Sequence, residues 1–123
     1  MISFIVIPRI LQPERTLNVG SQVDDSVYQY TKHIEDKEKI VEYEKWFDGI
    51  EFSNDIEEPT GYAEIVVDLV NHKEGTMVHP ISIWIDGEDI TVINNIGFKS
   101  TEFETPEGKL TKTQLDKLRK IIK

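Results

Sequence analysis

The stretch MVHPISIWIDGEDITVI, residues 77–93, decides the fold class. Isoleucines at 81, 83 and 85 alternate with Ser82 and Trp84, and a period of two is typical of a strand with one buried face. Asp86-Gly87 is a strong signal for a tight turn, and Ile90–Ile93 is the returning strand. The stretch therefore predicts a β-hairpin, the basic unit of an antiparallel sheet.

Further segments of β-type composition lie on both sides of this hairpin, bounded by glycine, proline and asparagine. Pro106-Glu-Gly is expected to break the last of them. The predicted strands are residues 2–7, 26–33, 62–70 and 98–103, and the predicted turns are residues 18–22, 71–75 and 94–97.

Residues 36–48 are predicted to form a helix. Ile40, Tyr43, Phe47 and Ile50 recur at the spacing that places side chains on one helix face. A hairpin made of residues 27–34 and 39–47 fits the same composition, so the choice between helix and hairpin stays open.

The C-terminal segment carries a complete signal for the start of a helix. Thr111 and Gln114 have the spacing of a capping box, and Leu110 and Leu115 have that of the accompanying hydrophobic staple. Together these elements predict a single α+β domain over residues 1–123. It has an antiparallel sheet of about five or six strands, a C-terminal helix and, if residues 36–48 are helical, a central helix.

Composition narrows the class of protein. The chain has 123 residues, a net charge of -9 and no cysteine, which excludes disulfides, thiolate nucleophiles and cysteine-ligated metals. The first residues have no basic stretch before the apolar run, so we expect no signal peptide, and no stretch is long enough to span a bilayer. We expect a cytoplasmic protein without a cofactor.

The charge is concentrated in one part of the sequence. Residues 24–68 hold 14 acidic residues and 4 lysines, whereas residues 69–123 hold 8 acidic and 8 basic residues. A focused negative field attracts and orients a basic partner. It also argues against nucleic acid and against an anionic membrane as partners.

Few residue patterns favour catalysis. The acids at 86, 88 and 89 surround one turn, but turn geometry explains them and we predict no metal site. The chain has no phosphate-binding glycine loop and no nucleophile elbow, and we predict that it is not an enzyme. The alternatives kept are a small hydrolase, which would use His79 or His72 with Asp68 and the Asp86 turn, and a structural or regulatory subunit of a larger assembly.

The acidic segment also contains aromatic residues, and interfaces favour this mixture. Trp46 falls outside the apolar stripe of the predicted central helix and is therefore the candidate anchor. The carboxylates expected to contact lysine and arginine of a partner are Asp48, Glu51, Asp55, Glu57 and Glu58.

In size, acidity and lack of cysteine the chain resembles bacterial immunity proteins, which inhibit secreted nuclease toxins. The resemblance is one of composition and carries over no motif. It implies an inhibitor that binds a basic toxin, blocks the active site of that toxin and catalyses nothing itself.

Overall fold

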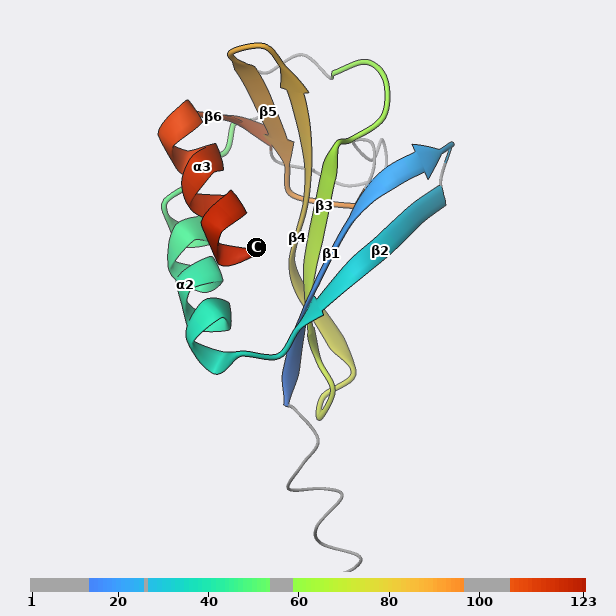
Figure 1. Ribbon diagram of the computed structural model, residues 1–123, viewed down its shortest axis with the longest axis vertical. Coiled ribbons are helices and arrows are strands. Elements are labelled where there is room, and N and C mark those ends of the chain that lie inside the picture. Colours follow the sequence, from blue (N-terminus) through green and yellow to red (C-terminus); the bar gives the residue numbers. More distant parts are fainter. Residues whose placement is uncertain (1–13, 26, 54–58, 97–106) are drawn as a thin grey trace, which may run out of the picture.

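The computed structural model describes residues 14–25, 27–53, 59–96 and 107–123. Six strands form one antiparallel sheet in the order β2-β1-β3-β4-β5-β6, and helices α2 and α3 lie next to each other on one face (Figure 1). The predicted α+β class is confirmed. The strands are β1 (Arg15–Asp24), β2 (Val27–Ile34), β3 (Ile65–Asn71), β4 (Thr76–Asp86), β5 (Asp89–Ile93) and β6 (Glu107–Leu110), and the helices are α2 (Lys37–Asp48) and α3 (Lys112–Ile121).

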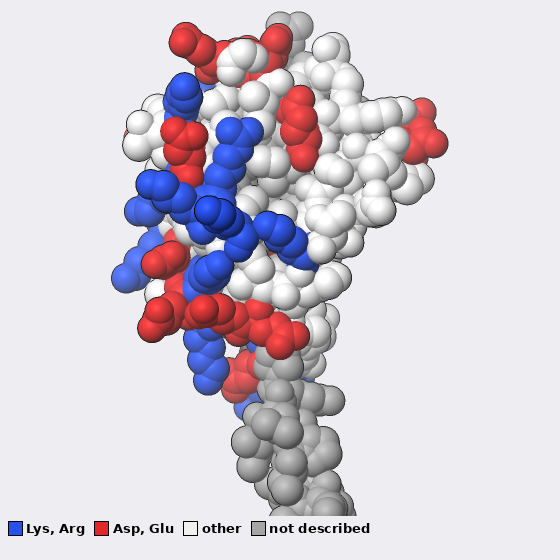
Figure 2. Space-filling view, in the orientation of Figure 1, with Lys and Arg blue, Asp and Glu red and all other residues white. Residues whose placement is uncertain are grey.

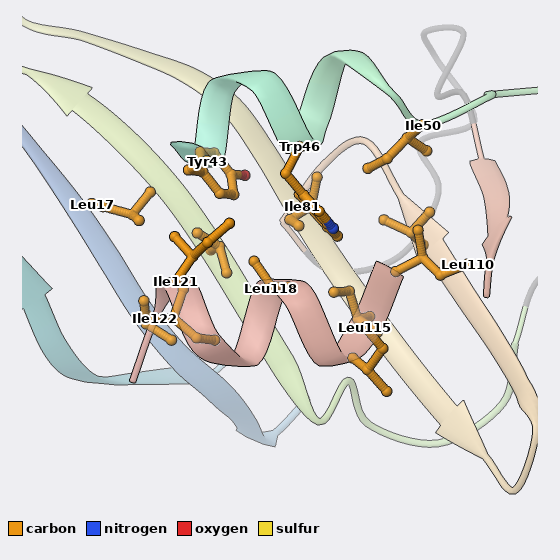
Figure 3. Packing of buried hydrophobic residues seen from close by; sticks show 14 of the residues in the cluster. Leu17, Tyr43, Trp46, Ile50, Ile81, Leu110, Leu115, Leu118, Ile121 and Ile122 are labelled. Carbon is orange, nitrogen blue, oxygen red and sulfur yellow. The ribbon is translucent and has the colours of Figure 1, made fainter. Parts of the chain in front are cut away.

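The main core lies between the sheet and the two helices (Figure 3). Leu17 of β1 and Ile81 of β4 point from the sheet towards Tyr43 of α2 and Leu118 of α3, and all four side chains are fully buried. Burial of large apolar side chains is the main favourable term in folding, at roughly 25 cal/mol per Å². This layer holds the helices on one face of the sheet, and a second, smaller apolar cluster is buried on the other face.

The face of the sheet that points away from the helices is largely buried and combines a second apolar cluster, which includes Val66, Trp84 and Ile93, with polar groups. Cross-strand pairing places Asn18 opposite Asp68, Val66 opposite Ser82, and Trp84 opposite Thr91 on this face. By the same pairing, it carries every buried polar or charged residue of the described chain. These are Thr16, Gln22, Asp68, Ser82, Thr91 and Glu107.

The central segment is helical, so the hairpin alternative for it is wrong. Asp36 is the N-cap of α2, and its carboxylate accepts hydrogen bonds from the backbone N–H groups of Glu38 at 2.9 Å and Lys39 at 3.4 Å. A side chain that satisfies these otherwise unpaired donors favours helix over strand. The predicted strand before it is confirmed as β2.

The turn predicted at residues 18–22 is wrong, because β1 runs straight through them. The residue that suggested a turn, Gly20, serves another purpose. A Cβ on Gly20 would overlap the backbone carbonyl of Gln29 in β2, so glycine is required for close approach of two strands. A shift in the β1–β2 register occurs at the same point.

The break predicted at Pro106 falls on residues outside the described part of the chain, and β6, which begins at Glu107, is a strand that the sequence analysis did not predict. Gly108 again allows close approach, because a Cβ there would lie 2.5 Å from the carbonyl oxygen of Glu51. The predicted strands 2–7 and 98–103 lie outside the described residues.

The strand predicted at residues 62–70 is present as β3 but begins only at Ile65, and residue 97 of the turn predicted at 94–97 lies outside the described residues. The turns at residues 71–75 and 86–87 are present, with Gly75 and Gly87 at positive φ. Thr111 caps α3, and both hydrogen bonds of the capping box with Gln114 are formed. No helix within the described part of the chain has the length and apolar character needed to cross a membrane.

Candidate functional site

A hollow of about 580 Å³ lies beside the turn between β4 and β5. Its lining combines three carboxylates, from Glu64, Asp86 and Asp89, with the aromatic rings of Tyr62 and Trp84. Tyr62 is 44% exposed, whereas the other aromatic side chains among the described residues are buried or half-buried. The hollow is therefore a concave surface with negative charge and an accessible ring.

The segment that carries Tyr62 is fixed to the sheet by several hydrogen bonds. Ala63 exchanges two with Gln22, at 3.1 and 3.0 Å, and the indole N–H of Trp84 donates to the carbonyl of Gly61 at 3.0 Å. Glu64 donates its backbone N–H to the carbonyl of Ile83 at 2.9 Å. Because neighbouring backbone is held on both sides, the ring of Tyr62 is presented from a rigid support.

The carboxylates of the hollow differ in what they already bind. Asp89 accepts a hydrogen bond from the Lys109 ammonium at 2.8 Å, and Lys109 also contacts Thr91 at 2.8 Å. Glu64 accepts a hydrogen bond from the backbone N–H of Ile85. Asp86 is exposed at the end of β4. One lysine against three acids leaves the hollow with a net negative charge.

Two further acids extend this negative surface. Asp24 and Asp25 lie at the turn between β1 and β2, and the Tyr62 hydroxyl donates to the Asp24 carboxylate at 3.2 Å. Burial first, and then the adjacent Asp25 and Asp24 carboxylates, raise the pKa of Tyr62 above its ordinary value. The phenol therefore stays protonated at neutral pH, its one O–H is donated to Asp24, and the exposed ring remains available to a partner.

The remaining described acids of the central segment lie elsewhere. Asp36 and Glu38 are at the start of α2, which is separated from the Asp24–Asp25 turn by the eight residues of β2, roughly 25 Å. Glu44 forms an ion pair with Arg15. In Figure 2 red side chains lie below a band of blue side chains, and those at the top lie where Figure 1 has the β4–β5 turn, which is outside the acidic segment of residues 24–68. The acidic sequence segment does not form one continuous surface.

The expectation that Trp46 is an exposed anchor is wrong. Its side chain is 5% exposed, and its indole N–H donates to the carbonyl of Gln114 at 2.8 Å. Its ring stacks on that of Tyr43, with 5.9 Å between the ring centroids. The helix α2 packs against both the sheet and α3, so its buried face is wider than the stripe that the sequence indicates.

The predicted contact carboxylates are only partly described. Asp48 and Glu51 are both exposed, at the end of α2 and in the segment that then runs along β6. Neither lines the hollow. Asp55, Glu57 and Glu58 lie outside the described residues, and Pro59, which follows them, lines the hollow.

Both histidines of the hydrolase alternative lie away from the Asp86 turn, whereas Asp68 lies opposite the β4 bulge that contains His79. Nε2 of His72 lies 2.7 Å from the hydroxyl oxygen of Thr16. The ring of His79 packs on that of Phe47, with 4.3 Å between the ring centroids. His72 lies in the turn next to one end of β4 and Asp86 at the other, and an eleven-residue strand is roughly 30 Å long. No group of three histidine, aspartate or glutamate side chains in the described ranges could hold a metal ion.

A polar network on the second face of the sheet was missed by sequence reasoning. Asn18 donates from Nδ2 to the buried carboxylate of Asp68 at 2.9 Å, and its Oδ1 lies 2.6 Å from Nδ1 of His33. Burial, followed by the charge of Asp68 and a hydrogen bond to it, raises the pKa of Tyr30. The available signal was Asp68 itself, a carboxylate within an apolar strand, because a buried charge needs partners.

Comparison with known proteins gives no further identification: no family model, no curated protein and no solved structure matches the chain. The acidic hollow is thus defined by its geometry alone.

Proposed function

We propose that the chain is a protein-binding inhibitor that docks a basic partner at the acidic hollow. The observation that carries this proposal is the exposed ring of Tyr62 beside the carboxylates of Glu64, Asp86 and Asp89. Carboxylates bind the guanidinium of arginine through charge-assisted hydrogen bonds, and an aromatic face attracts a cation. A lysine or arginine side chain of a partner fits this combination.

The kind of partner follows from the charges. Basic residues concentrate at phosphate-binding sites, so an acidic surface that covers such a site competes with a nucleic acid. A nuclease-type toxin has such a site, and inhibition by an immunity protein would need no catalysis by this chain. Electrostatic steering gives fast association, and tight affinity then follows from slow dissociation. Exposed Asp48 and Glu51 remain candidate contacts at the margin of this interface.

The first experiment uses a hexa-arginine peptide as a probe of the hollow. We expect calorimetric titration to detect binding that weakens with added salt, because the contacts are ionic and partly exposed. The double variant D86N/D89N should reduce the affinity about ten-fold, which is the loss of one or two charged contacts.

The matched control is E38Q/E42Q, which removes the same charge from the outward face of α2. It should leave most of the affinity intact. Equal losses in the two variants would show a diffuse field instead of a site, and no loss in D86N/D89N would place binding elsewhere.

The second experiment concerns inhibition. The chain is expressed together with the basic domain of the protein encoded beside its own gene, and cell survival and co-purification are measured. We expect rescue that D86N/D89N weakens and E38Q/E42Q does not. Survival that is independent of the chain would contradict the inhibitor proposal, even if the peptide binds.

A further inference from the structure

The two edges of the sheet differ in how they are covered. Along β6, Ser53 exchanges backbone hydrogen bonds with Glu107 at 2.5 and 2.9 Å. The strand β2 pairs with β1 on one side, and no described residue pairs with its outer side. An edge strand with unpaired N–H and C=O groups can accept another strand.

Only part of β2 is regular enough for this purpose. In the β1–β2 pairing Val19 lies opposite Lys32 and Gly20 opposite Tyr30, so Thr31 is an extra residue that forms a bulge. A bulge bends the strand and disturbs its ladder. A second register shift lies between Gln22 and Asp24, where Val23 is the extra residue on β1, so β2 itself stays continuous over Val27–Tyr30.

Opposite charges lie at the two ends of this edge. At one end are Asp24 and Asp25, next to the side chains of Val23 and Val27, which are 47% and 50% exposed. At the other end Lys32 lines a second hollow, of about 420 Å³, together with Arg119 and Lys123 of the C-terminal segment. Among the described residues, no carboxylate lies within ion-pair distance of these three cations.

The basic end belongs to a wider band of positive charge. In Figure 2 blue side chains gather across the molecule where Figure 1 places α3. Lys32 donates to the carbonyl of Ile122 at 3.0 Å and Lys39 to that of Lys123 at 3.2 Å. These hydrogen bonds give donors to backbone carbonyls at the C-terminal end of α3 and fix the positions of the two ammonium groups. A carbonyl does not neutralise an ammonium group, so both lysines can still attract a carboxylate of a partner.

We propose that two copies of the chain associate through β2, antiparallel and related by a two-fold axis. Pairing Val27–Tyr30 with the same residues of a second copy brings Lys32 of each copy to the Asp24–Asp25 turn of the other. The two-fold axis forms this contact twice. It also covers the exposed side chain of Val27, so apolar burial and charge complementarity act together.

The same charges exclude the competing arrangements. A parallel pairing would place Lys32 against Lys32 and the acidic turn against itself, and like charges at such distances repel. A lysine on an edge usually prevents strand addition. Here Lys32 permits only the antiparallel alignment that places it opposite a carboxylate. A second copy of the chain supplies that carboxylate from its Asp24–Asp25 turn, whereas an arbitrary strand does not.

The test is sedimentation velocity on the whole chain, over concentrations up to millimolar. We expect a reversible dimer whose dissociation constant rises about ten-fold in K32E and in D25K, because each variant creates like-charge contacts. The double variant K32E/D25K exchanges the charges and should restore the dimer. Both side chains are exposed, and because K32E also removes the hydrogen bond to the carbonyl of Ile122, thermal unfolding of each variant is measured beside its sedimentation.

Two controls separate this inference from the proposed function. The pair K117E and E42K makes the same charge changes away from β2 and should leave the dimer unchanged, as should D86N/D89N. A chain that stays monomeric at every concentration would overturn the inference. So would a dimer that K32E and D25K leave intact, or one that the charge exchange fails to restore.

Discussion

At the scale of single residues, Tyr43 shows how one hydroxyl group connects a helix to a strained strand. Its O–H donates to the carbonyl of His79 at 2.7 Å. His79 has φ of 50°, a left-handed conformation that is costly for a residue other than glycine, and it lies at the bulge where β4 shifts its register against β3. The hydrogen bond and the contact of His79 with Phe47 hold this bulge against α2.

We expect Y43F to lower the free energy of unfolding by about 1–2 kcal/mol at pH 7, because the carbonyl of His79 loses its donor. Urea unfolding measures this change. Y62F is the matched control, since its hydroxyl contacts an exposed carboxylate, and it should change stability little. Equal effects of the two variants would contradict the structural role given to Tyr43.

The same tyrosine affects stability in alkali. Burial, and then the charge of Asp68, raise the pKa of Tyr43 well above its ordinary value. The folded state therefore keeps the proton after the unfolded chain has lost it, so this stability is complete below about pH 10 and declines above it. In Y43F the decline above pH 10 should be shallower by up to about 1.4 kcal/mol per pH unit. Unfolding curves of both proteins from neutral to alkaline pH check this, and identical slopes would contradict it.

At the scale of elements, Gly20, where two paired strands approach closely, has a different role from Gly49 at the end of a helix. We expect G20A to destabilise the protein by about 1–3 kcal/mol, because its Cβ would overlap the Gln29 carbonyl and separate β1 from β2. Gly49 ends α2 at φ of -83°, and a Cβ there would lie 3.4 Å from its nearest neighbour, the carbonyl oxygen of Trp46, so G49A should be neutral. Thermal unfolding of both variants decides the matter, and a neutral G20A would show that the strands can separate without cost.

The C-terminal helix depends on its cap. Thr111 accepts a hydrogen bond from the N–H of Gln114 at 3.1 Å, and the Gln114 side chain accepts one from the backbone N–H of Thr111 at 2.8 Å. T111A should cost about 1 kcal/mol in stability, whereas T113A, an exposed change within the same helix, should be neutral or slightly stabilising. Denaturant unfolding compares the two. A loss as large in T113A would indicate that helix propensity matters more than the cap.

At the scale of the whole molecule, charge is arranged in opposite patches and not in the single acidic surface that the sequence suggested. The acidic hollow and the basic hollow share Glu64 in their linings, so the two adjoin. Adjoining patches of opposite charge fix the orientation of a charged partner, whereas a net charge spread evenly over the surface only attracts it. The salt dependence predicted for peptide binding tests the acidic hollow, and the charge exchange K32E/D25K tests the basic end of β2.

The site was less predictable than the fold. Alternation and turn signals located the β4–β5 hairpin, and the capping box located α3, because these patterns act within a few residues. The hollow joins residues from four separate segments, and nothing local indicates that Tyr62 lies beside Asp24 and Asp86. Trp46 was misplaced for the same reason, since only the position of α3 shows that a second neighbour covers it.

The order of amino acids alone determined the α+β class, the C-terminal helix and the turns at residues 71–75 and 86–87, since hydrophobic period, caps and glycines at positive φ impose them locally. The choice between helix and hairpin for residues 36–48 was left to the tertiary structure. Tertiary structure alone decided which carboxylates meet, that Gly20 permits strand approach, and that Asp68 is buried among partners. Charge and close packing act through space between residues far apart in sequence, so they exist only once the sheet and the helices have assembled.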